Sequence, residues 1–211
     1  MSGCVSTLGG GATSAEGTYL PPPEETGLNV DHPTYGDPVP EVEMLDVFTD
    51  EQVSTDQDTE FLMTFFFTFC PTECIWLISS MTHAEARVLE KGLDRPRVLA
   101  ATFDPARDTP KRLRDYAERM GIDADAGNWS FLRPEDEGAA EEVITGEFGV
   151  NFRKATKETE AGVYDFLHTT LILLVNEDGY VERTYRNDDP DPDVIANDWE
   201  ALVEAQRAEE A

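Results

Sequence analysis

The stretch Phe61-Leu-Met-Thr-Phe-Phe-Phe-Thr-Phe-Cys-Pro-Thr-Glu-Cys74 decides the fold of this chain of 211 residues. Its first part, residues 61–69, is almost entirely apolar and aromatic. This run is too short to span a membrane, and its composition is typical of a fully buried strand. A turn runs from Cys70 to Cys74, and residues 75–91 then carry apolar side chains at helical spacing. Gly92 ends this helix, because glycine readily adopts the left-handed conformation found after helix C-termini. The stretch therefore predicts a core strand, a turn that holds two cysteines, and a helix.

The remainder of the chain predicts an alternation of strands and helices. The expected elements are a hairpin or strand pair at 42–53, strands at 97–103, 129–132, 163–174 and 180–186, and helices at 110–120, 134–147 and 190–208. Thr109 is the expected N-cap of the second helix, and Asn176-Glu-Asp-Gly179 is the expected hairpin turn. This order predicts an α/β fold with a central mixed β-sheet flanked by helices. A cysteine pair that follows the first long core strand and opens a helix is the arrangement of thioredoxin-like folds.

The first 38 residues differ in composition from the rest of the chain. They are rich in Gly, Ser, Thr, Pro and acidic residues, which predicts a flexible linker ahead of a folded domain at 39–211. The start Met1-Ser-Gly-Cys4 resembles the end of a bacterial lipoprotein signal, so Cys4 is a candidate for lipid attachment. The alternative is a free cysteine in a disordered tail. Lipid attachment would place the folded domain on the outer face of the cell membrane.

The charge of the chain excludes two kinds of partner. There are 44 acidic and 16 basic residues, a formal net charge of −28, and only four of the basic residues are lysines. Nucleic acids and anionic lipids both require clustered Lys and Arg, so neither is expected to bind the folded part. Membrane contact is expected only through an N-terminal anchor. Many carboxylates with few lysines are typical of proteins that stay soluble at high salt, which predicts a halophilic setting rather than a cationic partner.

The two cysteines of the turn suit metal binding or thiol chemistry. The N-terminus of a helix carries a partial positive charge, which lowers the pKa of a nearby thiol and favours the thiolate. Two adjacent thiolates, from Cys70 and Cys74, fit either disulfide exchange or a soft metal such as Cu(I). A purely structural cysteine pair is the alternative on this spacing alone.

His168 is the histidine that the predicted topology brings to the cysteine pair. It precedes the strand that leads to the hairpin turn, where thioredoxin-type reductases usually have a cis-proline, and no proline lies between Pro134 and Pro190. An imidazole facing two thiolates completes a three-ligand set of two sulfurs and one nitrogen, which suits copper. The alternative is a histidine that caps the end of a strand. His32 is expected to be solvated in the linker, and His83 to be exposed on the first helix.

Three motifs in this order resemble the Sco/SenC family. They are Phe67-Thr-Phe-Cys-Pro-Thr-Glu-Cys74, Thr102-Phe-Asp-Pro-Ala-Arg-Asp-Thr-Pro110, and Leu167-His-Thr-Thr170 followed by Asn176-Glu-Asp-Gly179. The resemblance covers about Val39 to Ala208 and implies a thioredoxin-like fold with an N-terminal hairpin and an inserted hairpin before the last strands. It also implies extracytoplasmic anchoring by a lipid or a signal anchor, and copper bound by Cys70, Cys74 and His168.

The same resemblance assigns roles to the middle motif and shows two departures. Asp104, Arg107 and Asp108 match the family signature and are interpreted as loop architecture beside the site rather than as ligands. The family commonly has proline after the second cysteine and aspartate before the histidine, whereas this chain has Ile75 and Leu167. These departures affect the surroundings of the site and leave the three candidate ligands in place.

The sequence supports two functional hypotheses. The first is a copper-binding metallochaperone that assists assembly of the dinuclear copper centre of cytochrome c oxidase, with subunit II as the copper-accepting partner. The second is a thiol-disulfide oxidoreductase in which Cys70 attacks and Cys74 resolves, with a cysteine-bearing oxidase subunit or other extracytoplasmic protein as its substrate. A peroxide-reducing enzyme on the same fold is disfavoured, because Phe67 stands where that chemistry prefers threonine.

Overall fold

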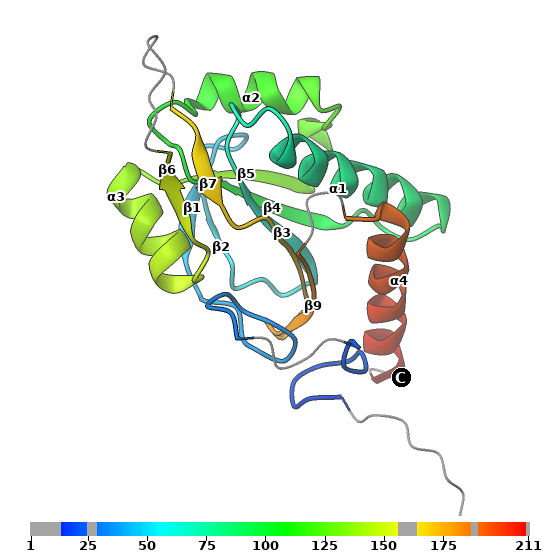
Figure 1. The fold of residues 1–211 in the computed structure, drawn as a ribbon. Helices are drawn as coiled ribbons and strands as arrows, with labels where there is room; N and C mark the ends of the chain where they lie inside the picture. The colour runs from blue at the N-terminus through cyan, green and yellow to red at the C-terminus, as the bar shows by residue number, and fades with distance from the viewer. Residues whose placement is uncertain (1–13, 25–28, 156–163, 187–189, 210–211) are drawn as a thin grey trace, which may run out of the picture.

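A mixed sheet forms the centre of the molecule (Figure 1). The structure is a computed structural model that describes residues 14–24, 29–155, 164–186 and 190–209. The strands of this sheet, in the order in which they pair, are β2 (Gln52–Ser54), β1 (Glu43–Asp46), β5 (Trp129–Arg133), β4 (Arg97–Thr102), β3 (Phe61–Phe66), β8 (Ile172–Val175) and β9 (Val181–Tyr185). β3, β4 and β5 run parallel, and β1, β2, β8 and β9 pair antiparallel with their neighbours. The predicted α/β fold with a central mixed sheet is confirmed.

Helices flank the sheet. They are α1 (Glu73–Glu90), α2 (Pro110–Arg119), α3 (Glu137–Ala140), which continues as a π-helix over Glu141–Glu147, and α4 (Pro192–Glu209), with a short 3₁₀ turn at Ala124–Ala126. Figure 1 shows α1 and α4 next to each other on one side of the sheet and α3 on the other side. The N-cap prediction is confirmed, because Thr109 accepts a hydrogen bond from the backbone N–H of Arg112 at 3.3 Å.

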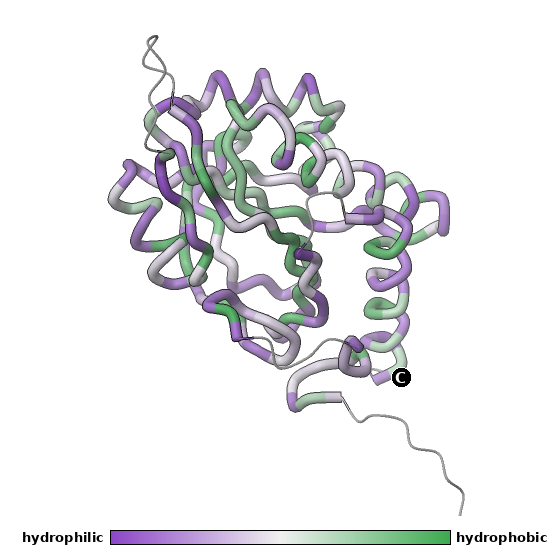
Figure 2. The backbone as a smooth tube through the Cα atoms, viewed as in Figure 1, coloured by the Kyte–Doolittle hydropathy of each residue, from purple (hydrophilic) through white to green (hydrophobic). Residues whose placement is uncertain are grey.

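The core is built on β3, the strand that leads into the turn with the two cysteines. All six residues of β3 are buried, as expected for a strand covered on both faces. β3 lies between β4 and β8, so its backbone groups are hydrogen-bonded on both edges. Figure 2 shows the apolar residues concentrated in these central strands and the polar residues on the outer faces of the helices. Because β3 is fixed on all sides, the turn that follows it has a defined position at the end of the sheet.

The strand predicted at 163–174 is wrong in the part that the structure describes. Two shorter strands replace it: β7 (Phe166–His168), which pairs with β6 (Phe152–Lys154) in a separate two-stranded sheet, and β8. The chain changes sheets between them, where the side-chain hydroxyl of Thr64 donates to the backbone oxygen of Leu171 at 2.8 Å. β6 and β7 form the inserted hairpin before the last strands that the fold prediction contained.

Parts of the N-terminal segment pack against the domain. Within 14–24, Leu20 is buried, and the backbone N–H groups of Tyr19 and Leu20 donate to the buried carboxylate of Glu182 at 2.7 and 3.0 Å. Within 29–38, the N–H of Gly36 donates to a backbone oxygen of β9 at 2.9 Å. The boundary between linker and domain at residue 38 stays a prediction, but these described parts of the segment contact the domain.

The expectation of a solvated His32 is wrong. This side chain is 7% exposed, because the chain at Asp31 and His32 runs directly over Gly149. Gly149 has φ +63°, and a Cβ there would lie 2.0 Å from the backbone oxygen of Asp31, so a side chain cannot be accommodated. His83 is exposed, as predicted, whereas Cys4 lies outside the described residues. Among the described helices, none is both long enough and apolar enough to cross a membrane.

Candidate metal centre

Both cysteines of the turn lie at the N-terminus of α1. Cys70 is in the turn after β3, Cys74 is in the first turn of the helix, and both are buried with free thiols. The backbone N–H of Cys74 donates to the sulfur of Cys70 at 3.3 Å. The helix therefore presents one of its unpaired N-terminal N–H groups to a cysteine sulfur, which favours the thiolate form.

His168 lies at the end of β7 and completes a compact cluster. Its Nε2 atom is 3.8 Å from the sulfur of Cys74, and its Nδ1 atom is 3.3 Å from the backbone oxygen of Thr169. One ligand atom from each of Cys70, Cys74 and His168 lies within 4.8 Å of the others. The structure thus brings together the three residues that sequence analysis selected. Two sulfurs and one imidazole nitrogen form a donor set that a soft metal ion prefers.

The two cysteines of the cluster differ in pKa. The hydrogen bond from the thiol of Cys74 lowers the pKa of Cys70 to about 5, together with hydrogen bonds from His168 and from backbone N–H groups, although burial works against the shift. Burial and the neighbouring Cys70 raise the pKa of Cys74 well above its ordinary value. Burial lowers the pKa of His168, but the hydrogen bonds to Cys70 and to the backbone of Thr169, together with the negative charges of Cys70 and Glu73, outweigh burial and raise the pKa overall. Cys70 is therefore the thiolate of the pair at neutral pH.

This difference in pKa predicts how the alkylation rate of each cysteine depends on pH. Because the thiolate is the reactive form and the pKa of Cys70 is about 5, alkylation of folded Cys70 by iodoacetamide should be nearly constant from about pH 6 to 8. Its rate should fall as the pH drops through 5, and Cys74 should stay unlabelled at neutral pH. Peptide mass spectrometry measures both rates. In urea-unfolded protein, where a cysteine has a pKa of about 8.5, the Cys70 rate should rise about tenfold per pH unit over the same range. The same steep rise in the folded protein would contradict the prediction.

Asp108 positions the end of β3 without joining the cluster. Its buried carboxylate accepts hydrogen bonds from the N–H of Thr68 at 3.0 Å and from the hydroxyl groups of Thr68 and Thr102 at 2.5 and 2.6 Å. Burial raises the pKa of Asp108 despite these hydrogen bonds. Because Thr68 is two residues before Cys70, the carboxylate fixes the backbone that leads into the turn.

Asp104 and Arg107 connect the same loop to the hairpin. Arg107 forms an ion pair with Asp104, donates to the backbone oxygen of Tyr164 at 2.7 Å, and stacks on the Tyr164 ring at 3.6 Å. The hydroxyl of Tyr164 donates to Asp104 at 2.8 Å. Tyr164 leads into β7, so this network holds the strand that carries His168. The middle motif therefore surrounds the cluster, and its carboxylates are not among the clustered ligand atoms.

Aromatic packing and one carboxylate complete the surroundings, and sequence analysis missed them. The ring of His168 packs against Phe103 and Phe67, with ring centroids 5.0 and 5.9 Å apart. Phe67 occupies the place where a peroxide-reducing site would need a hydroxyl, and it is buried. Glu73 lies inside the cysteine spacing, and its carboxylate accepts a hydrogen bond from the thiol form of Cys70 at 3.3 Å. The position of Glu73 between the cysteines was a usable signal, whereas nothing in the sequence marked Phe103 as a neighbour of His168.

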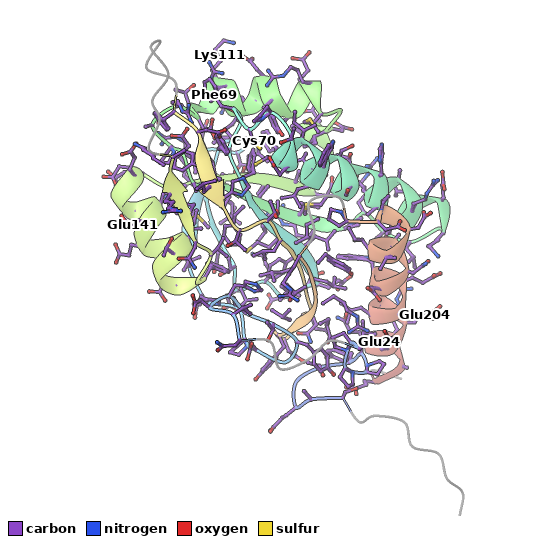
Figure 3. All side chains as sticks on the ribbon, viewed as in Figure 1. Glu24, Phe69, Cys70, Lys111, Glu141 and Glu204 are labelled. Carbon is purple, nitrogen blue, oxygen red and sulfur yellow. The ribbon has the colours of Figure 1, made fainter. Side chains whose placement is uncertain are left out.

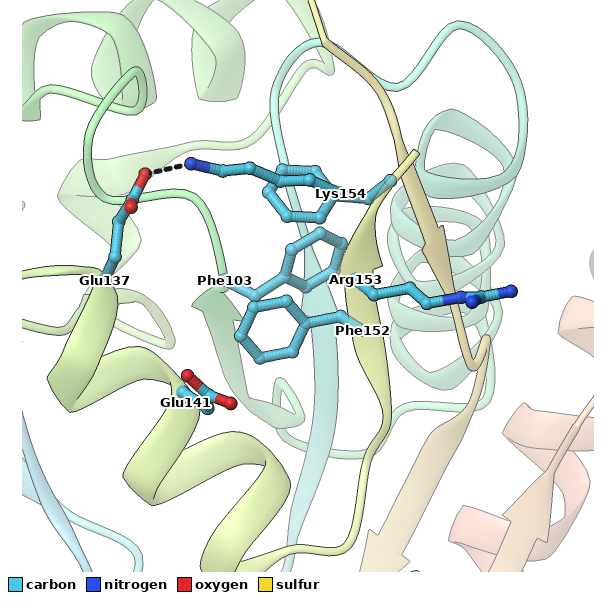
Figure 4. Close-up of a pocket in the computed structure, with 7 residues that line it drawn as sticks. Phe103, Glu137, Glu141, Phe152, Arg153 and Lys154 are labelled. Atoms are coloured by element: carbon cyan, nitrogen blue, oxygen red, sulfur yellow. Dashed lines mark hydrogen bonds and ion pairs between the residues drawn. The ribbon is translucent and has the colours of Figure 1, made fainter. Parts of the chain in front are cut away.

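A cavity of about 280 Å³ lies behind the hairpin (Figure 4). Phe103 and Phe152 are stacked in its wall, with ring centroids 5.0 Å apart, and Lys154 reaches across to form an ion pair with Glu137 at 2.6 Å. Phe103 thus separates this cavity from His168. The ion pair ties the hairpin to α3, so it contributes to the position of β7.

The fold and the cluster define a thioredoxin-like protein with two thiols and one imidazole at the N-terminus of its first helix. The chain matches the SCO1/SenC family over residues 47–204, and it belongs to this family. The family is one of copper-binding proteins, and in this member Cys70, Cys74 and His168 lie close together.

Individual relatives agree with this assignment. The SCO1 protein homolog of Bacillus subtilis (strain 168) is 28% identical over 138 residues, which cover 64% of this chain and 67% of the relative. ScoI from Bradyrhizobium japonicum, solved with copper bound, superimposes with a TM-score of 0.61 at 23% identity, covering 79% of this chain and 99% of that chain. A SCO1/SenC family lipoprotein from Bacillus anthracis str. Ames has a TM-score of 0.64 at 19% identity, covering 79% and 95%. The solved structures establish the common fold.

Proposed function

We propose that this protein binds copper through Cys70, Cys74 and His168 and delivers it to subunit II of cytochrome c oxidase during assembly of the dinuclear copper centre. The observation that carries the proposal is the convergence of two sulfurs and one imidazole nitrogen within 4.8 Å. Membership of the SCO1/SenC family and the copper-bound relative from Bradyrhizobium japonicum support copper as the metal.

The chemistry of the cluster suits a metal that is carried rather than kept. Thiolates and a neutral imidazole prefer Cu(I) over hard cations, and Cys70 is already a thiolate at neutral pH. The described part of the chain offers a cluster of three ligand atoms, so an incoming thiol or imidazole of the acceptor can displace them one at a time. His168 is only partly buried and lies on a two-stranded hairpin at the edge of the molecule, where an acceptor has access.

Reduction of a partner disulfide is the second candidate, and the low pKa of Cys70 favours it. The Cys70 thiolate attacks one sulfur of the partner disulfide, which forms a mixed disulfide and releases the other partner sulfur as a thiolate. Cys74 then loses its proton and attacks the Cys70 sulfur, which forms the Cys70–Cys74 disulfide and releases the second partner thiol. Two electrons pass from the cysteine pair to the partner, so each protein molecule completes one such cycle before it must be reduced again.

The proposed site of action is the extracytoplasmic face of the cell membrane. The Bacillus anthracis relative described as a lipoprotein supports an anchored domain, and Cys4 is the candidate for attachment. The acidic surface of the chain fits a salty exterior, where its repulsion is screened within about 3 Å at 1 M salt.

Replacing His168 tests the three-ligand site. The variant His168→Ala should bind Cu(I) at least about tenfold more weakly, because loss of even an outer partner of a metal ligand commonly costs that much. Competition with a chromophoric Cu(I) chelator measures the affinity. His83→Ala is the matched control, since His83 is exposed on α1 and should leave binding unchanged. Full-strength binding without His168 would reject the three-ligand site, and the exchange rate of the cysteine pair with an oxidised subunit II fragment would then test the second candidate alone.

A further inference from the structure

Exposed apolar side chains gather around the cluster. The described residues contain seven large hydrophobic side chains that are exposed, and four of them lie within two residues of Cys70, Cys74 or His168. These four, which we call the rim, are Phe69 (37% exposed), Ile75 (37%), Trp76 (46%) and Leu167 (57%). Single exposed apolar residues are common on protein surfaces, but a group around one site marks a place where another molecule binds.

The rim comes from the three segments that carry the candidate ligands. Phe69 precedes Cys70 in the turn, Ile75 and Trp76 are in the first turn of α1, and Leu167 precedes His168 in β7. A helical turn rises only about 5.4 Å, so these residues remain at the same end of the molecule as the cluster. A molecule that covers Phe69, Ile75 and Trp76 therefore lies beside the cysteines, while Leu167 neighbours His168 along β7 with its side chain on the opposite face of the strand.

A cationic group borders the rim. The guanidinium of Arg112 lies 4.2 Å from the centre of the Phe69 ring, and that of Arg107 lies 4.5 Å from it. Arg107 is paired with Asp104, whereas exposed Arg112 forms no ion pair with any carboxylate that the structure describes. Stacking on an aromatic ring holds a guanidinium in place and leaves its N–H groups available.

We propose that the rim and Arg112 form the docking surface for the protein that accepts copper, and that this partner presents an apolar surface beside a carboxylate. The proposal rests on the proposed function and adds the chemistry of the partner's contact surface. Tryptophan and arginine are the residue types that most often dominate binding energy at protein interfaces. Trp76 supplies the apolar contact, and Arg112 supplies a cation that pairs with the carboxylate in two parallel hydrogen bonds.

Two other occupants fit the observations less well. A second copy of this chain would pack the same surface against itself, so that two Arg112 side chains and two strongly acidic molecules would meet. An anionic membrane surface requires a cluster of free basic residues, whereas at this edge Arg107 is paired with Asp104 and Lys111 with Asp115, which leaves Arg112. Figure 3 shows Phe69, Cys70 and Lys111 at the same end of the molecule.

The test uses the copper-free protein and the soluble domain of oxidase subunit II from the same organism. Trp76→Glu and Arg112→Glu should each weaken the complex more than about tenfold by isothermal titration calorimetry, which is the loss that separates dominant interface residues from their neighbours. The matched controls are Val194→Glu, which changes a residue 47% exposed on α4, and Arg114→Glu on the same helix as Arg112. Both controls should bind within about twofold of the parent protein.

The readouts keep docking and copper binding apart. Cu(I) affinity, measured separately against a chelator, should be the same in Trp76→Glu and Arg112→Glu as in the parent. If both variants bind the domain as the parent does, the docking proposal is overturned, whatever the copper affinity. If the parent protein fails to bind Cu(I) at all, the proposed function is overturned instead. Raising the salt concentration should reduce the difference in affinity between Arg112→Glu and the parent, because salt screens the charge contact.

Discussion

Replacing Cys70 by serine should lower the Cu(I) affinity of this protein by more than about 100-fold, the upper range of what loss of an outer partner of a metal ligand costs. A serine hydroxyl has nearly the same size as a thiol but stays protonated at neutral pH, and its oxygen is a poor donor to a soft metal. Cys70 is the thiolate of the pair, with a pKa of about 5, so its loss removes the negative charge of the cluster as well as a ligand. Chelator competition measures the affinity.

Cys4→Ser is the matched control for this substitution. It changes the remaining cysteine of the chain, lies outside the described residues and should leave the affinity unchanged. Cys74→Ser should resemble Cys70→Ser, because both sulfurs belong to the same cluster. A Cys70→Ser protein that binds Cu(I) as tightly as the parent would show that the metal is held elsewhere.

Replacing Phe103 by alanine should lower the free energy of unfolding by about 3–5 kcal/mol, the usual cost of deleting a buried phenylalanine. Phe103 is 1% exposed, and its ring packs against Phe67, Phe152 and Phe166 with centroids 5.0 to 5.2 Å apart. Removing the ring joins the space that it fills to the cavity behind the hairpin, so the neighbours cannot close the gap completely. Urea unfolding followed by circular dichroism measures the loss.

Leu89→Ala provides the reference for this stability change. Leu89 is 38% exposed on α1, so its truncation should cost less than about 0.5 kcal/mol. Phe103→Ala should also weaken Cu(I) binding in the protein that remains folded, because His168 loses a wall of its pocket. A loss of stability as small as that of Leu89→Ala would contradict the buried position of Phe103.

The elements near the cysteine pair were predictable because their signals are local. A continuous apolar run at 61–69 has few alternatives to a buried strand, and Thr109 followed by proline marks a helix start in a short window. The turn at Asn176 is likewise set by its own residues, since the Asn176 side chain accepts hydrogen bonds from the N–H groups of Asp178 and Tyr180. Each of these features depends on contacts within a few residues.

The features that sequence analysis missed depend on contacts far apart in the chain. The run at 163–174 has uniform strand character, and only its pairing with β6 on one part and β3 on the other divides it. His32 is buried because Gly149, more than a hundred residues later, leaves room for the chain to cross. Composition predicts that such a segment is flexible, and no local pattern reveals the surface that receives it.

The candidate site likewise has one part that the sequence predicts and one part that depends on distant contacts. The spacing of Cys70 and Cys74 and the position of His168 follow from residue types and chain order, and the structure brings the three together. The aromatic contacts of His168 come from Phe67 and Phe103, which follow the neighbouring strands β3 and β4, and nothing in their motifs pairs them with a histidine far along the chain. The candidate ligands are therefore readable from the sequence, while the packing that orients their side chains is a property of the folded chain.

The contacts of the N-terminal segment with β9 have a mechanical consequence. Glu24 and Cys70 lie at opposite ends of the molecule in Figure 3. A pulling force on the chain ahead of residue 17 reaches the domain through the hydrogen bond from the Asn176 side chain to the backbone oxygen of Gly17 and through those of Tyr19 and Leu20 to Glu182 in β9. The load then passes into the central sheet, far from the turn and the hairpin that carry the cluster. A tether attached at the proposed site, Cys4, would therefore pull on the end of the domain that lies away from Cys70, Cys74 and His168.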